Sequence, residues 1–76
     1  MNKARRKELS KAAEMLREAY DIIESCKDDE EDAYDSLPES FQDGERGNEM
    51  QEYIDAMDEA LDQIDEAANA IEEIAE

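Results

Sequence analysis

The stretch that decides the fold is 28-DDEEDAYDSLPESFQDGERGNEM-50, near the middle of a chain of 76 residues. It holds the only proline of the chain, Pro38, and both of its glycines, Gly44 and Gly47. Proline is tolerated in the first turn of a helix, but it pushes the residue before it out of helical geometry. Asp43-Gly44 is a typical turn pair. These residues predict a break between two segments that are otherwise helical in pattern.

Apolar residues on both sides of this break recur at alternating steps of three and four, which is typical of one stripe along a helix. With Leu9 at heptad position a, the first stripe holds Leu9, Ala12, Leu16, Ala19, Ile23 and Cys26, widened by Ala13 and Tyr20 at e and by Met15 and Ile22 at g. The second stripe holds Met50, Ile54, Met57, Leu61, Ile64, Ala68, Ile71 and Ala75, widened by Tyr53, Ala60, Ala67 and Ile74 at g. No β pattern is present, so we predict one all-α domain over 1–76, with helices at about 3–35 and 46–75.

Between the helices we expect a turn with a short helical segment, at about 36–45. Ser36 and Glu39 have the spacing of a capping box, so Ser36 is expected to end the first helix and open the short one, with Pro38 in its first turn. Asn48 is expected to cap the second long helix.

Three apolar side chains near the turn, Tyr34, Leu37 and Phe41, are expected to form a lid over the end of the helix pair, because Leu37 and Phe41 are four residues apart. Arg46 is the only base after residue 27, among twenty acids. A salt bridge from Arg46 to Asp43, Asp35 or Glu39 is its simplest predicted role.

The net charge of −17 is unevenly divided: residues 1–27 carry seven bases and five acids, and residues 28–76 carry one base and twenty acids. Bases at the start of one helix and acids at the end of another each oppose the helix dipole. An antiparallel pairing places the two ends together, where each compensates the other. The fold class predicted is therefore an antiparallel two-helix hairpin resembling a coiled coil. The apolar width at both e and g favours pairing of two hairpins into a four-helix bundle, as a homodimer.

Chemistry is mostly excluded by composition. With no histidine and a single cysteine, the chain can form neither an internal disulfide nor a zinc site, and Cys26 has no base to activate it. We expect Cys26 to be a core residue at position d. The run Asp28–Asp32 lacks the glycine and the bidentate glutamate of an EF-hand. We predict a non-enzymatic protein with no cofactor or metal. No secretory signal or apolar run of eighteen residues is present, so a cytoplasmic protein is expected.

The middle third of the chain resembles small uncharacterised acidic hairpin proteins of phages and prophages of Gram-positive bacteria, which share a pattern like EE-A-D-LPES-Q--ERG--M. The matching residues are Glu30, Glu31, Ala33, Asp35, Leu37, Pro38, Glu39, Ser40, Gln42, Glu45, Arg46, Gly47 and Met50. The resemblance implies a helical hairpin and an origin in a mobile element, which would place the protein in the host cytoplasm. It implies no activity and no catalytic residue.

The acidic face of the second helix is the feature with functional content, because Glu49–Glu76 contains eleven acids and no base. A field of this sign repels nucleic acid and anionic membranes and attracts basic protein surfaces. The residues expected to face such a partner are Glu52, Asp55, Asp58, Glu59, Asp62, Asp65, Glu66 and Glu73. One hypothesis is a nucleic-acid mimic, such as a phage inhibitor of a host defence protein. The alternative is a self-associating assembly module whose acids only keep it soluble.

Overall fold

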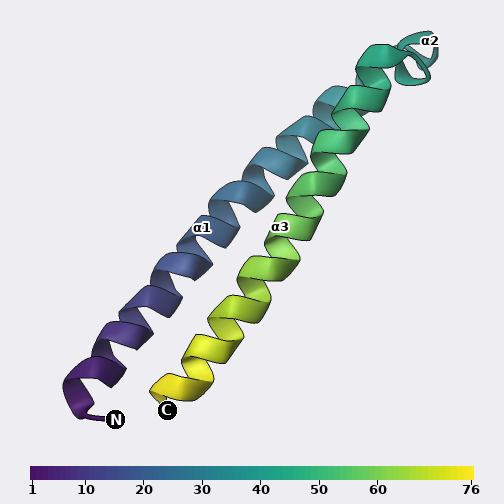
Figure 1. Cartoon of the computed structure of the whole chain (residues 1–76). Helices are drawn as coiled ribbons and strands as arrows, with labels where there is room; N and C mark the ends of the chain where they lie inside the picture. The colour runs from purple at the N-terminus through teal and green to yellow at the C-terminus, as the bar shows by residue number, and fades with distance from the viewer.

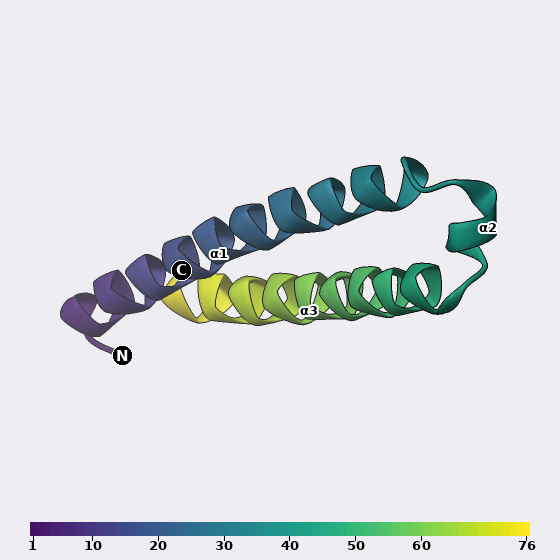
Figure 2. The same cartoon turned by 90° about the horizontal axis from the view of Figure 1, so that it is seen from above.

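A computed structural model describes residues 1–76 and shows three helices and no strand: α1 (Lys3–Asp35), α2 (Glu39–Gln42) and α3 (Glu45–Ala75). The two long helices run antiparallel side by side, with both termini at one end and α2 at the other (Figures 1 and 2). The Cα atoms span 58 × 14 × 12 Å, so the molecule is a thin rod. The predicted all-α antiparallel hairpin is confirmed, and the long helices begin and end within one residue of the predicted bounds.

Helix α1 begins at an asparagine and ends at a serine. The Asn2 side chain accepts a hydrogen bond of 2.8 Å from the Arg5 amide, as an N-cap does. At the other end the Ser36 hydroxyl donates to the Asp32 carbonyl over 2.9 Å, so Ser36 caps the C-terminus. The expected capping box from Ser36 is therefore wrong. Pro38 has extended geometry and is itself the residue before α2, which moves the start of the short helix two residues later.

The corner between α2 and α3 is tighter than the sequence suggests. Helix α3 begins directly after Gly44, so Asn48 lies within its first turns and does not cap it, which corrects that expectation. The Gln42 side chain donates hydrogen bonds of 3.2 Å to the carbonyls of both Tyr34 and Leu37. Gln42 thereby joins α2 to the end of α1, a role that no sequence pattern indicated.

The predicted lid over the helix ends is only partly formed. Tyr34 and Leu37 are half-buried, whereas Phe41 is exposed and does not cover the core. Leu37 and Phe41 would share a helix face only if one helix contained both, and α2 begins after Leu37. Arg46 is exposed and forms no ion pair, so the expected salt bridge is absent.

The core of the hairpin consists of Ala13, Ile54, Leu61 and Ala68. On α1 every residue at position e from Ala13 to Tyr34 is buried or half-buried, while at position d Cys26 and Ala33 are exposed. Helix α1 thus turns positions a and e toward α3, a rotation away from the predicted a and d. The expectation that Cys26 is a core residue is wrong for this reason.

Candidate binding surfaces

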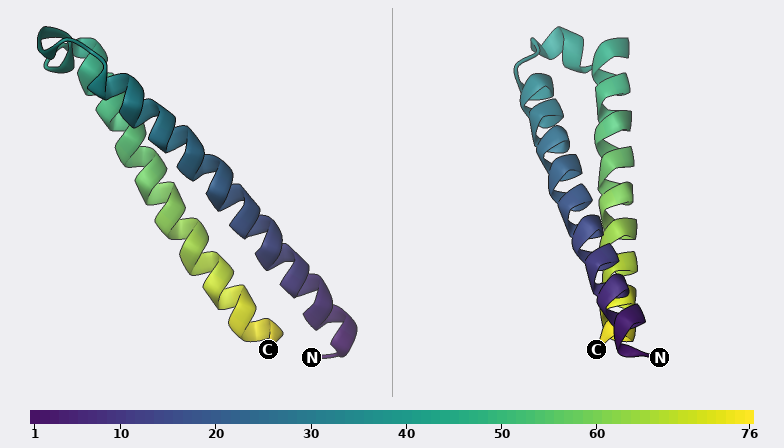
Figure 3. Two further views of the ribbon diagram at one scale, coloured as in Figure 1. Left: turned by 180° about the vertical axis from the view of Figure 1, so that it is seen from behind. Right: turned by 90° about the vertical axis from the view of Figure 1, so that its left-hand side faces the viewer.

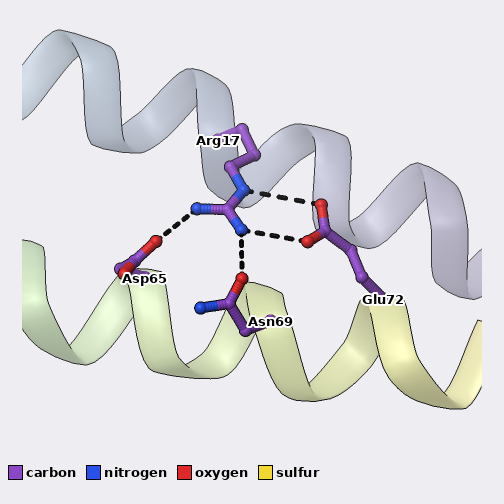
Figure 4. A network of polar contacts seen from close by, with 4 residues as sticks. All are labelled: Arg17, Asp65, Asn69 and Glu72. Carbon is purple, nitrogen blue, oxygen red and sulfur yellow. Dashed lines mark hydrogen bonds and ion pairs between the residues drawn. The ribbon is translucent and has the colours of Figure 1, made fainter.

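One side of the hairpin is joined by a cluster of polar contacts around Arg17 (Figure 4). Its guanidinium donates to Asp65 over 2.5 Å, to the side-chain oxygen of Asn69 over 2.7 Å, and to both oxygens of Glu72 over 2.9 and 3.5 Å. Asp65, Asn69 and Glu72 follow one another along α3 at intervals of about one turn. The single side chain of Arg17 therefore contacts two successive turns of α3. This arrangement needs the planar donor geometry of arginine.

Two further bases of α1, Lys27 and Arg6, also contact α3 or the residue after it. The ammonium group of Lys27 lies 2.6 Å from Asp58 and 3.5 Å from Glu31. At the end of the rod that holds both termini, the Arg6 guanidinium donates a hydrogen bond of 2.8 Å to the backbone oxygen of Glu76. This oxygen follows the last turn of α3 and accepts no hydrogen bond from within the helix. We name the side of the hairpin with these contacts the ion-pair face.

The protonation of these bases is favoured by their partners. Hydrogen bonds to Glu72 and then Asp65 raise the pKa of Arg17, and the hydrogen bond to Asp58 raises the pKa of Lys27. A base whose pKa is raised by folding contributes its full stabilisation below its ordinary pKa and loses it only as pH rises through the raised value. Both contacts therefore persist at neutral pH. Because these ion pairs remain accessible to solvent on one side, salt screens them and each contributes modestly.

These ion pairs divide the eight carboxylates that were expected to face a partner. Asp58 and Asp65 are engaged by Lys27 and Arg17, so they hold the hairpin together and no longer belong to a free acidic surface. The remaining six are exposed, form no ion pair, and lie along the outer edge of α3. We name them the acidic ridge: Glu52, Asp55, Glu59, Asp62, Glu66 and Glu73.

The charge density of the acidic ridge can be estimated from helix geometry. At about 1.5 Å rise per residue, Glu52 to Glu73 spans roughly 32 Å, with one carboxylate for about every 6 Å. A single DNA strand carries one phosphate for about every 3.4 Å, so the ridge has about half that density. A second acidic row on the outer edge of α1 was not singled out from the sequence. It consists of the exposed residues Glu14, Glu18, Asp21, Glu24 and Asp28.

The side of the hairpin opposite the ion-pair face carries no charged side chain along its middle. In an antiparallel pair, the g positions of both helices lie on one side of the seam and the e positions on the other. Along the middle of α1 the g positions hold Met15 and Ile22, which are 60% and 66% exposed, and the acids Glu8 and Asp29 occupy this position beyond them. Those of α3 hold Tyr53, Ala60, Ala67 and Ile74. We name these six apolar residues, together with Ala19 and Cys26 at position d of α1, the neutral face.

A shallow groove crosses the neutral face near the middle of the rod. It is lined by Ile23, Cys26, Glu30, Tyr53, Ala56, Met57 and Ala60. Glu30 is the single charged residue there and lies toward the α2 end. The phenol of Tyr53 donates to Glu49 over 3.0 Å, and this hydrogen bond raises the pKa of Tyr53. No histidine, lysine or arginine lines the groove beside the Cys26 thiol.

The structure brings together no group of three or more cysteine, aspartate or glutamate side chains arranged to hold a metal ion. None of its helices combines the length and the apolar composition that crossing a bilayer requires.

Comparisons with known proteins give no relative for this chain: no family model, no curated protein and no solved structure matches it.

Proposed function

We propose that this protein is a non-enzymatic acidic binding protein that covers the basic surface of a partner which otherwise binds nucleic acid. The observation that supports the proposal is the acidic ridge, six exposed carboxylates with no cation beside them on a helix that contains no base after Arg46. Ordinary exposed helices intersperse lysine or arginine to gain pairs across one turn. Helix α3 has no base after Arg46, so it forms no such pairs over most of its length.

The mechanism is occlusion by a rod whose acidic ridge faces the basic surface of the partner. The summed charge speeds the encounter with a basic surface, and direct ion pairs then compete with the phosphates that the partner would otherwise bind. The ridge is sparser than a DNA strand, so shape and apolar contacts must supply part of the affinity. The resemblance to phage hairpins makes a host protein that handles or degrades nucleic acid the partner class we favour.

The test is capture from host lysate at low and high salt, with duplex DNA added as a competitor. A ridge variant carries Glu52→Gln, Asp55→Asn, Glu59→Gln and Asp62→Asn. A matched control carries Glu14→Gln, Glu18→Gln, Asp21→Asn and Glu24→Gln, which removes the same charge from the outer edge of α1. We expect the wild type and the control to capture a basic protein that salt and DNA release, and the ridge variant to lose it.

Two results would contradict the proposal. Capture that ignores both salt and DNA would mean that charge does not drive binding. Equal capture by the ridge variant and the control would mean that only net charge matters and that the ridge is no distinct surface.

A second candidate function is a self-associating assembly hairpin whose acids only keep it soluble. The neutral face favours it, because a row of large exposed apolar residues on a highly charged protein marks an interaction surface. Its binding would survive high salt and be lost on Ile22→Glu. Ile22 lies on the neutral face, whereas Tyr20 and Leu37 are half-buried and Phe41 is in the short helix α2.

A further inference from the structure

We propose that a second copy of this chain covers the neutral face, with the two rods antiparallel, so that the α2 end of one hairpin lies beside the termini of the other. This inference deepens the self-association candidate by naming the face, the orientation and the register. It stands whether or not the acidic ridge binds a basic partner.

The first argument is that the hairpin alone has too little core. Only 5 of its 76 residues are buried, and one of these is a glycine. Domains of this size bury a small fraction of their surface and commonly need a disulfide, a metal or a partner chain. Cys26 is the only cysteine, and no metal cluster is present. A partner chain is the remaining source of burial.

The second argument concerns area and charge. A face two helices wide, each about 10 Å across, that extends over roughly half of the 58 Å rod offers several hundred square ångströms, near the 800 Å² per partner of a standard interface. Two copies each carry a net charge of −17, so they can approach only through a surface that is poor in acids. The neutral face is such a surface, with Glu30 as the one acid of its groove, and it leaves the acidic rows of both copies exposed to solvent.

The third argument fixes the orientation. At the end with the termini, residues 1–11 and 72–76 together carry five bases and four acids, whereas residues 28–52 at the other end carry eleven acids and one base. The hairpin therefore has a nearly neutral end at the termini and a strongly acidic end at α2, and Figure 3 shows these two at opposite ends of the rod. Parallel packing would place two strongly acidic ends together, whereas antiparallel packing places each acidic end beside a nearly neutral end that holds five bases.

The register follows from contacts between the helices. Arg6 contacts Glu76, Arg17 contacts Asn69 and Lys27 contacts Asp58, so the stretch 53–74 of α3 lies level with roughly residues 10–31 of α1. The middle of the neutral face is thus close to Ala19 and Ile22. A two-fold axis through this level brings Met15 of one copy level with Cys26 of the other.

Cysteine cross-linking tests this geometry directly. Within one chain, positions 15 and 26 are about 16 Å apart along α1, too far for a disulfide. In the antiparallel dimer two Cys26 residues are likewise about 16 Å apart along the rod. We expect the Met15→Cys variant to form covalent dimers on mild oxidation or with a short bifunctional thiol reagent, while the wild type does not.

A matched control places the new thiol on the outer edge of α1, as Asp21→Cys, and should stay uncross-linked. Light scattering on the wild type under reducing conditions gives the mass without any substitution, and we expect a dimer. A monomer at high concentration would overturn the proposal and leave the neutral face to another protein. Efficient Cys26–Cys26 cross-linking of the wild type would overturn the antiparallel orientation. A dimer in which Met15→Cys fails to cross-link would overturn the register.

The proposed dimer and the proposed binding function are tested by different variants, so one proposal can be wrong while the other holds. Removing charge from the acidic ridge should leave the mass of the dimer unchanged, and Ile22→Glu should convert the dimer to monomer.

Discussion

At the corner between α2 and α3, Gly47 is buried and has no room for a side chain. A Cβ there would overlap the backbone of Gln42, with the Gln42 Cα at 2.7 Å. Backbone atoms cannot move aside as the end of a flexible side chain can. Gln42 in turn holds the end of α1 through its two hydrogen bonds to Tyr34 and Leu37. The reversal of the chain therefore depends on the lack of a side chain at Gly47 and on the side-chain amide of Gln42.

Gly47→Ala is expected to destabilise the hairpin by about 1–3 kcal/mol, because the overlap forces the α2–α3 corner apart and outweighs the higher helix propensity of alanine. Gly44→Ala is the matched control, since a Cβ at Gly44 would lie an ordinary 3.5 Å from the Phe41 carbonyl oxygen. It should change stability by less than about 0.5 kcal/mol. Urea unfolding followed by circular dichroism measures both. Equal effects of the two substitutions would show that the corner is not tight.

At the scale of the element, α1 presents a different side to α3 than its apolar pattern predicts. Its apolar stripe is wide, and either edge could have met α3. Arg17 at position b and Lys27 at position e reach acids on α3 only when α1 turns its e side inward. Ala13 and Ala68, 2% and 0% exposed, then both lie in the seam, where small residues let the helices approach. With this rotation of α1, Met15 and Ile22 lie outside the seam and are exposed to solvent.

The rotation of α1 can be tested with one residue type at two positions. Ala13→Leu should destabilise by about 1–3 kcal/mol, because it inserts three carbons into a filled seam. Ala33→Leu places the same side chain at an exposed position d and should be close to neutral. Thermal unfolding of both variants measures the difference. If Ala33→Leu proves the more disruptive, α1 packs through a and d after all.

At the scale of the whole molecule, a 58 Å rod with four apolar core residues is a poor independent folding unit. Most of its apolar side chains are half-buried at best, so the free energy gained from the seam is small against the entropy of ordering 64 helical residues in α1 and α3. The neutral face holds the apolar surface that could still be buried. The stability of the folded hairpin is therefore expected to depend on dimer formation.

The consequence is a thermal midpoint that depends on concentration. If the folded state is a dimer, the midpoint should rise by about 3–5 °C for each tenfold increase in protein, because association stabilises the folded state by mass action. Ile22→Glu should abolish this dependence and lower the midpoint. Scanning calorimetry or circular dichroism over two decades of concentration measures it. A wild-type midpoint that is constant over this range would indicate a self-sufficient monomer.

The sequence by itself determined the two long helices, their bounds and their antiparallel pairing. These follow from local information: an apolar repeat of three and four, a proline and two glycines between the repeats, and charges that compensate only in a hairpin. Tertiary structure alone decided which edge of the wide stripe on α1 faces α3, and with it the exposure of Cys26 and the loss of Asp58 and Asp65 from the acidic ridge. The apolar pattern allows several rotations of α1, and the contacts of Arg17 and Lys27 with specific turns of α3 select one of them.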